Sequence, residues 1–319
     1  MPKEQKKFAD DGWAVWVDGE NLSTVYINDW ISPKGKSYVD IAVRIRGIKT
    51  SRFLHVYVPF SVSKEEIEDV SLLFKDMRTL HAVFSVACIV DYKKNEHTSE
   101  IAYNGKTVDI IHMSTLDYEL TPVSEGTLIN INLNEAQPFI DNDEAYFIWR
   151  MPHKSLDQIF KPHVNVGSTF ERFVDLFTTP VITEKYGYSI RVNESRLLPE
   201  GITKIGGFHR QKLEKTIINI SIDESYELND AGCYRIRRLE GDIYKEYLPK
   251  DYCCEDAIVY MWKQENESDL HGQFNFYYSI SKNSVSKGSM ILYLILLPSI
   301  DVLGNFVADG IYALIDLFK

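Results

Sequence analysis

Short runs in which apolar and polar residues alternate recur along this chain, and they restrict it to a fold built on sheets. The clearest run spans 38–48, where apolar residues share one side and Arg44 and Arg46 share the other. A period of two places alternate side chains on opposite faces of a strand. We therefore expect a half-buried strand at 38–48, joined by a tight hairpin to the run at 52–58.

Runs of the same kind continue through both halves of the chain. Aromatic residues make up 13% of the sequence, and together with β-branched residues they suit half-buried, pleated surfaces. Asn104-Gly105 separates two of the runs, which is a type I′ hairpin signal. The pattern predicts a mainly β (α+β) protein of antiparallel β-sandwich-like units, with one or two short helices and a C-terminal amphipathic helix.

One internal helix is expected near the N-terminal third. Ser63 and Glu66 have the spacing of a capping box, and apolar residues then recur at helical spacing, which predicts a helix over 64–76. Alternation is lost around 152–167, which suggests two β-rich domains, 1–152 and 168–319. A single large domain is equally compatible with 319 residues.

The C-terminal segment is the most unusual part of the sequence. An unbroken apolar run at 290–297 is too short to span a membrane by itself, since a spanning helix needs about 20 apolar residues. It suits a doubly buried strand or the first part of an interfacial helix. Beyond Pro298, residues Asp301, Asn305, Asp309 and Asp316 fall within about 80° of one another on a helix.

The rest of that helix is apolar, which predicts a surface for docking or self-association. The residues expected to carry it are Leu303, Phe306, Val307, Ile311 and Leu314. Packing against the chain's own sheet is the plainer alternative. Membrane attachment through 290–318 is less favoured, because membrane-surface helices carry Lys and Arg on the polar face.

Two groups of arginines lie on expected strands and could hold a small anionic ligand, because guanidinium groups grip phosphate and carboxylate bidentately. They are Arg44, Arg46 and Arg52 in the first half and Arg235 and Arg237 in the second. The alternative is a solvated face paired with the surplus of acidic residues. A formal net charge of −11 argues against nucleic acid as a partner.

Location and cofactors follow from weaker signals. The first residues lack an apolar core typical of a secretory signal. The four cysteines form no spaced pair that would indicate a zinc site or a disulfide framework. We expect a cytoplasmic protein, with peripheral membrane attachment left open, and neither a metal nor a cofactor.

The sequence contains no recognisable catalytic motif. It lacks a nucleophile elbow, a phosphate-binding loop and a zinc-binding HExxH helix. His153 and His163 flank the expected domain boundary and could meet in space. We therefore expect a non-enzymatic recognition, sensor or adaptor protein that binds a ligand or a protein partner. A hydrolase with a dispersed carboxylate or histidine site, or a structural assembly subunit, remains an alternative.

Overall fold

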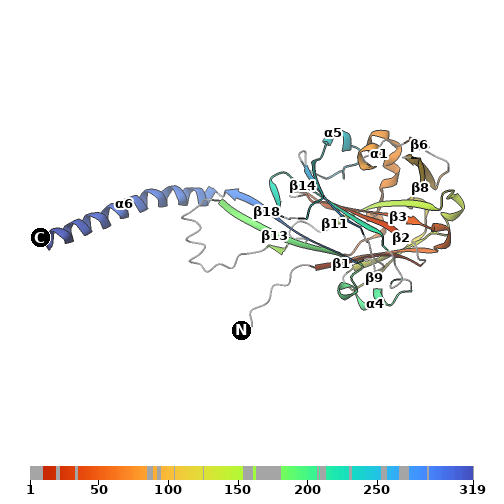
Figure 1. Ribbon diagram of the computed structural model, residues 1–319, viewed down its shortest axis with the longest axis horizontal. Helices are drawn as coiled ribbons and strands as arrows, with labels where there is room; N and C mark the ends of the chain where they lie inside the picture. Colours follow the sequence, from red (N-terminus) through yellow and green to blue (C-terminus); the bar gives the residue numbers. More distant parts are fainter. Residues whose placement is uncertain are drawn as a thin grey trace. The chain divides into compact units, whose positions relative to one another are not determined.

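The computed structural model of the chain describes most of its residues (Figure 1). The described ranges are 10–18, 22–32, 35–84, 89–91, 95–103, 105–124, 126–153, 161–162, 181–206, 208, 213–229, 232–252, 257–265, 273–285 and 287–318.

Two units emerge from the distribution of contacts, and neither is one continuous stretch of sequence. Unit 1 comprises Met1–Lys161, Gly187–Glu224 and Asp230–Tyr278. Unit 2 comprises Pro162–Tyr186, Ser225–Asn229 and Ser279–Lys319. Strands from both halves of the sequence therefore build unit 1.

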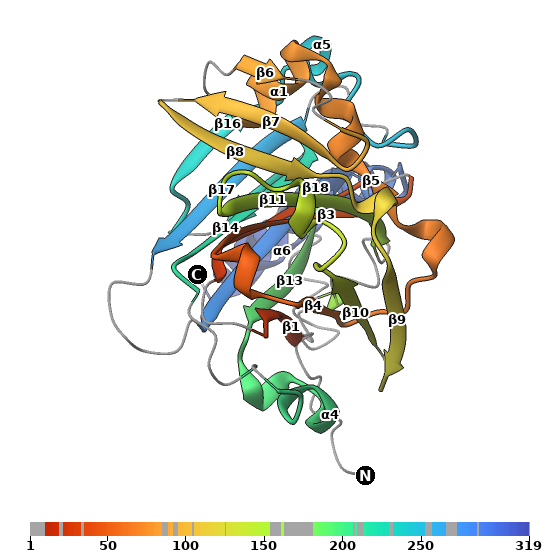
Figure 2. The same ribbon diagram turned by 90° about the vertical axis from the view of Figure 1, so that its right-hand side faces the viewer.

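The larger of two mixed sheets has ten strands. The order along its path is β16 (Arg235–Arg238), β17 (Ala257–Glu265), β14 (Lys215–Asp223), β2 (Leu22–Trp30), β3 (Ser37–Arg46), β11 (Glu144–His153), β8 (Lys106–Ile111), β7 (Thr98–Tyr103) and β6 (Ile89–Asp91), with β5 (Glu68–Asp69) beside β11. Figure 2 shows this sheet from the side on which β3, β8 and β11 run next to one another.

The second sheet has eight strands. Its order is β15 (Tyr226–Asn229), β18 (Phe274–Val285), β13 (Val181–Val192), β1 (Asp10–Val17), β4 (Phe53–Val58), β10 (Gly126–Asn132) and β9 (Tyr118–Val123), with β12 (Lys161–Pro162) beside β13. β15 and the part of β18 from Ser279 onward pair within unit 2.

The mainly β class is confirmed, and the sheets are mixed because some strands pair across long stretches of sequence. β1 pairs in parallel with β13, and β2 pairs in parallel with β14. Parallel neighbours require long crossover connections, which local patterns do not reveal. The expected hairpin at Asn104-Gly105 is confirmed, since β7 and β8 are antiparallel and Gly105 has a positive φ of 72°.

Side chains from the two sheets meet in a sandwich-like core in unit 1. Trp13 of β1 lies 6.0 Å from the ring of His153 on β11, and Trp262 of β17 lies 4.4 Å from the ring of Phe276 on β18. The outer face of the ten-stranded sheet is covered by 3₁₀ helix η3 (Val70–Lys75) and by helices α1 (Met77–Phe84) and α5 (Gly241–Tyr244). β3 and β11 are consequently buried on both faces.

A buried polar network joins β3 to β11. Arg150 is 2% exposed, and its guanidinium donates to both oxygens of Asp40 at 2.6 and 3.0 Å and to the carbonyl of Tyr247 at 2.8 Å. Trp30 and the Tyr247 hydroxyl donate to the same carboxylate. Burial alone would lower the pKa of Arg150, but Asp40 outweighs it and the pKa is raised, so the guanidinium stays charged.

The expected hairpin between 38–48 and 52–58 is wrong. β3 pairs with β2 and β11 in the ten-stranded sheet, whereas β4 pairs with β1 and β10 in the other sheet. The intervening turn, η1 (Ile48–Thr50), follows Gly47 in the left-handed conformation. The chain therefore changes sheet at this turn.

The single helix expected over 64–76 is also wrong, although its capping box is present. Residues 64–66 form a 3₁₀ turn, η2 (Lys64–Glu66), and η3 begins at Val70. Between them Glu68 and Asp69 pair with β11, which interrupts the helical course. Hydrogen bonding to a neighbouring strand outweighed the local helical pattern here.

Of the two alternatives for the apolar run at 290–297, the doubly buried strand is wrong, because the run is helical. This run lies inside α6 (Lys287–Leu317), a helix of 31 residues that continues through Pro298. Among the described residues, the other short helices are η4 (Met113–Thr115), η5 (Gln137–Phe139), η6 (Ser195–Leu197) and α4 (Glu200–Thr203).

Candidate functional site

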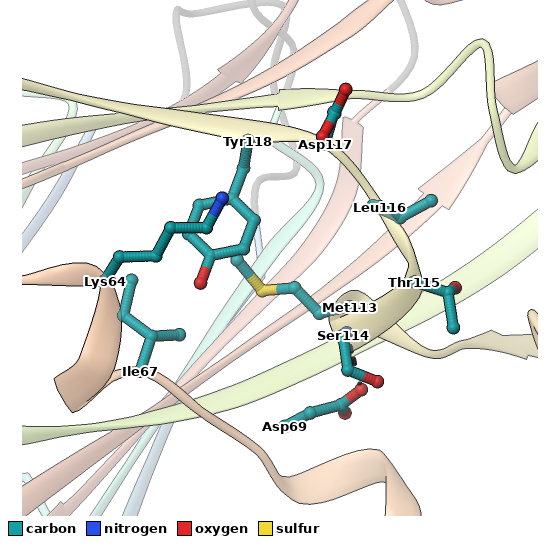
Figure 3. Close-up of a pocket in the computed structure, with 9 residues that line it drawn as sticks. All are labelled: Lys64, Ile67, Asp69, Met113, Ser114, Thr115, Leu116, Asp117 and Tyr118. Carbon is teal, nitrogen blue, oxygen red and sulfur yellow. Dashed lines mark hydrogen bonds between the residues drawn. The ribbon is translucent and has the colours of Figure 1, made fainter.

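A pocket of about 380 Å³ opens where η2, η4 and the start of β9 come together in unit 1 (Figure 3). It is lined by Lys64, Ile67, Asp69, Met113, Ser114, Thr115, Leu116, Asp117 and Tyr118. One ammonium group, two carboxylates and three hydroxyl groups thus surround a small volume.

Asp69 organises the floor of this pocket. Its Oδ1 accepts a hydrogen bond from the backbone N–H of Ser71 at 3.0 Å, and its Oδ2 accepts one from the N–H of Ser114 at 2.8 Å. The first bond caps the start of η3, a role that short acidic side chains perform well. The second bond fixes η4 beside it, as Figure 3 shows for Ser114 and Asp69.

Lys64 and Tyr118 form the opposite wall. The Lys64 ammonium lies 4.5 Å from the centre of the Tyr118 ring, a cation–π contact visible in Figure 3. Burial raises the pKa of Tyr118, and the charges of Glu65 and Asp69 raise it further. The Tyr118 hydroxyl therefore stays protonated and can donate a hydrogen bond to a ligand.

A histidine lies behind the pocket, between two serine hydroxyls. His112 Nδ1 is 2.9 Å from Ser71 Oγ, and His112 Nε2 is 2.9 Å from Ser99 Oγ. Ser71 Oγ also donates to Asp69 Oδ1 at 2.5 Å. Because that donation uses the hydroxyl proton, Ser71 accepts from His112 and cannot be activated by it.

This arrangement supports binding more readily than catalysis. Ser71, Ser99 and His112 are all buried, so a substrate does not reach them. Within the described part of the chain, no cluster of three or more His, Cys, Asp and Glu residues could hold a metal ion. The pocket offers hydrogen bonds to a small polar ligand.

The arginines expected to bind an anion are engaged with acidic side chains or lie apart. Arg44 and Arg46 both contact Glu144, and Arg46 Nη1 lies 3.1 Å from Glu214. Arg52 is exposed just before β4, in the turn that leads into the other sheet. Arg44 and Arg46 therefore each have an acidic partner.

The second arginine group is remote from the first. Arg235 and Arg237 lie on β16, the strand at one end of the sheet, and the Arg237 guanidinium lies 5.3 Å from the Tyr244 ring centre. β17, β14 and β2 separate β16 from β3, a distance of about 19 Å at roughly 4.8 Å per step. One small ligand cannot touch both groups.

The histidine pair proposed from the sequence is only half described. His153 is buried, with Nδ1 3.1 Å from Asp29 Oδ1 and its ring packed against Trp13 and Phe60. His163 lies outside the described residues. His153 has the surroundings of a core residue.

The expected interaction residues lie in α6 and are uncovered. Leu303, Phe306, Val307, Ile311 and Leu314 are all exposed, and Phe306 reaches 71%. They occupy the side of the helix opposite Asp301, Asn305 and Asp309. A 23-residue segment, Leu294–Asp316, has a mean hydropathy of 1.6, and none of it is buried.

Sequence reasoning missed the pocket around Asp69 and Tyr118. Its residues come from two segments, 64–69 and 113–118, and no local motif connects them. The capping box at Ser63 and Glu66 was the one usable signal, since it places Lys64 at the start of an ordered turn.

Comparisons with known proteins provide no family for this chain. No family model and no curated protein matches it. Among solved structures, a Mu homology domain of Fcho1 from Danio rerio with a bound Eps15 peptide is 8% identical, over 87% of this chain and 81% of that one. Its TM-score of 0.13 is too low to carry any argument about fold or function.

Proposed function

We propose that this protein is a non-enzymatic recognition protein whose β-rich unit 1 binds a ligand or partner and whose helix α6 attaches the chain to a lipid bilayer. The observation that carries the proposal is the uncovered apolar surface of Leu294–Asp316. A helix that is apolar on most sides needs a partner surface or a membrane around it.

The dimensions of the segment suit a bilayer. Twenty-three residues at 1.5 Å per residue give about 35 Å, and a typical hydrocarbon core is about 30 Å thick. By length and composition, the segment is long and apolar enough to cross a membrane. The apolar run at 290–297, too short to span a membrane by itself, is part of a continuous helix of 31 residues.

The acidic residues set a limit on this insertion. Twelve Leu, Ile, Phe and Val residues within the segment contribute about −0.3 to −0.6 kcal/mol each. Asp301 and Asp309 each oppose insertion by up to about 2.5–3.5 kcal/mol if they reach the bilayer centre. The two contributions nearly cancel for one helix alone.

Self-association is therefore the second candidate role of α6. Asp301, Asn305 and Asp309 share one narrow stripe along the helix. Polar residues within membranes usually face another helix or water, where they pair instead of contacting lipid tails. Two or more copies of α6 could enclose the stripe and leave the apolar side, with Phe306 and Ile311, toward lipid.

Flotation of the full chain with phosphatidylcholine vesicles tests the proposal. We expect the chain to float with the vesicles, equally at low and high salt, because apolar insertion is not screened by ions. The variant Phe306→Lys, Val307→Lys, Ile311→Lys should remain at the bottom of the gradient. The matched variant Tyr234→Lys, exposed on unit 1, should float as the wild type does.

The alternatives give different results in the same experiment. A wild-type chain that stays soluble without vesicles and does not float would contradict membrane attachment. A soluble oligomer that the triple lysine variant dissociates would instead favour a docking or assembly helix.

A further inference from the structure

We propose that a second pocket in unit 1, between the two sheets, binds a small, mainly apolar, uncharged ligand that carries one hydrogen-bonding group. The pocket has a volume of about 260 Å³ and lies near the ends of β14, β17 and β18, strands labelled in Figure 2. It is lined by Thr216, Ile218, Gly232, Trp262, Lys263, Gln264, Phe274 and Phe276.

The walls of this pocket are largely apolar and aromatic. Trp262 contributes from the ten-stranded sheet and Phe276 from the eight-stranded sheet, with ring centres 4.4 Å apart and planes inclined by 59°. Ile218 and Phe274 are almost completely buried beside them. About nine water molecules occupy the same volume in liquid water, at roughly 30 Å³ each. Apolar walls offer such waters few hydrogen bonds, so they hold water poorly.

Thr216 is the one polar residue that β14 contributes to the lining, and its register partner on β17 is Gln264. Along β14, residues 218, 220 and 222 are buried isoleucines on the same face as Thr216. Thr216 is 3% exposed, and its Oγ1 has no hydrogen-bond partner within the described residues. Valine has the same shape as threonine and would fill the space without burying an unsatisfied hydroxyl. Packing alone therefore does not account for a threonine at this position.

A hydroxyl at this position can both donate and accept a hydrogen bond. A ligand seated against Trp262 and Ile218, which are neighbours in the β14–β17 register, would meet it with a single polar group. Binding pockets of small molecules commonly combine apolar walls with few polar groups that fix orientation. Thr216 is therefore the residue that we assign to recognition of the polar group.

Lys263 does not supply a competing charge. Its ammonium lies 2.6 Å from Glu265 Oε1. In the pairing of β14 with β17, Lys263 lies opposite Ile217. Successive residues of a strand point to opposite faces, so Lys263 is on the other face of the sheet from Thr216 and Ile218. With no free cation provided by the described lining, the pocket favours a neutral ligand over an anion.

This inference does not depend on membrane attachment, because every lining residue belongs to unit 1 and α6 belongs to unit 2. Vesicle flotation and ligand binding can therefore fail separately.

Titration of the full chain in one detergent with indole and indene, two probes of the same size, tests the site. The probes differ in the N–H group, which only indole can donate to Thr216. Wild type should bind indole about three- to ten-fold more tightly than indene, the range expected of one neutral hydrogen bond. Saturation-transfer NMR measures both affinities.

Two variants and one control sharpen the result. Thr216→Val should abolish the preference for indole while leaving the melting temperature unchanged or raised, since an unsatisfied hydroxyl is removed. Ile218→Trp should fill the pocket and prevent both probes from binding. Thr121→Val, an exposed position on β9, should bind as wild type does.

The proposal is overturned if wild type binds neither probe or binds both equally. It is also overturned if Thr216→Val keeps the preference for indole, or if Ile218→Trp still binds. Should Thr216→Val fail to fold, the comparison of indole with indene on wild type remains decisive.

Discussion

β11 and α6 both contain long apolar runs, yet they end in opposite surroundings. In β11, the apolar residues 145–149 are buried on both faces between β3 and β8. In α6, residues such as Ile291, Leu294 and Phe306 are uncovered. Apolar composition fixes which groups avoid water, and the surrounding structure decides what shields them.

The backbone explains the difference between the two runs. A strand leaves its N–H and C=O groups to be paired by neighbours, so β11 requires β3 and β8 beside it. A helix pairs these groups internally. α6 can therefore project its side chains into another medium without any strand or helix of its own chain beside it.

The largest expected effect breaks the polar network that β11 shares with β3. Asp40→Ala leaves the Arg150 guanidinium buried without its carboxylate, which should lower the free energy of unfolding by about 3–5 kcal/mol. Glu214→Ala removes a carboxylate from the exposed Arg46 pair and should cost less than about 1 kcal/mol. Urea denaturation of the full chain measures both, and equal losses would contradict a special role for the buried network.

A matched pair of isoleucines tests the comparison directly. Ile148 of β11 is 0% exposed and Ile311 of α6 is 53% exposed. Ile148→Ala should lower the free energy of unfolding by about 2–5 kcal/mol. Ile311→Ala should change the unfolding of unit 1 by less than about 0.5 kcal/mol. A comparable loss at Ile311 would show that α6 is covered by the folded chain.

The acidic stripe of α6 allows a test of whether the helix inserts into a membrane. Asp309 lies in the interior of the apolar segment, whereas Asp316 is its last residue. Asp309→Leu should favour insertion by up to about 3 kcal/mol, and Asp316→Leu should have a much smaller effect. The fraction of chain that resists alkaline extraction from membranes measures this difference. No difference between the two variants would argue that the helix lies flat.

The smallest expected effect concerns a titratable group inside the sheet. Burial lowers the pKa of His55 below its ordinary value of 6.5, although its contact with Asn130 at 2.7 Å opposes the shift. As the pH falls, His55 is therefore protonated in the unfolded chain before it is protonated in the folded chain. The free energy of unfolding that neutral His55 contributes is fully present above pH 6.5. It is lost as the pH falls through the lowered pKa of His55 in the folded chain.

Comparison of wild type with His55→Gln isolates this contribution. Between pH 8 and pH 5, the unfolding free energy of wild type should fall more steeply than that of the variant. Parallel pH profiles would show that His55 does not carry the effect.

Local signals in the sequence predicted what depends on near neighbours. The strands expected at 38–48 and 52–58 are present as β3 (Ser37–Arg46) and β4 (Phe53–Val58). The Gly105 hairpin and the Ser63–Glu66 capping box are present too. Arg44 and Arg46 lie on one strand, β3, as expected, but Glu144 and Glu214 reach them from distant segments. Charge partners that depend on strand order could not be read from spacing.

The pockets show the same limit more clearly. Asp69, Ser114 and Tyr118 meet only because β5 pairs with β11 and η4 folds back beside it. Thr216 has an ordinary place in an alternating run, and its unsatisfied hydroxyl is apparent only between two packed sheets.

By itself, the sequence determined that this chain is mainly β, because alternation and turn chemistry act between residues that are close along the chain. It also determined that the last thirty residues are apolar with one acidic stripe. Only the tertiary structure decided which strands are neighbours, that Arg150 lies buried against Asp40, and that α6 is left uncovered. Those outcomes depend on contacts between distant segments, and no local pattern specifies them.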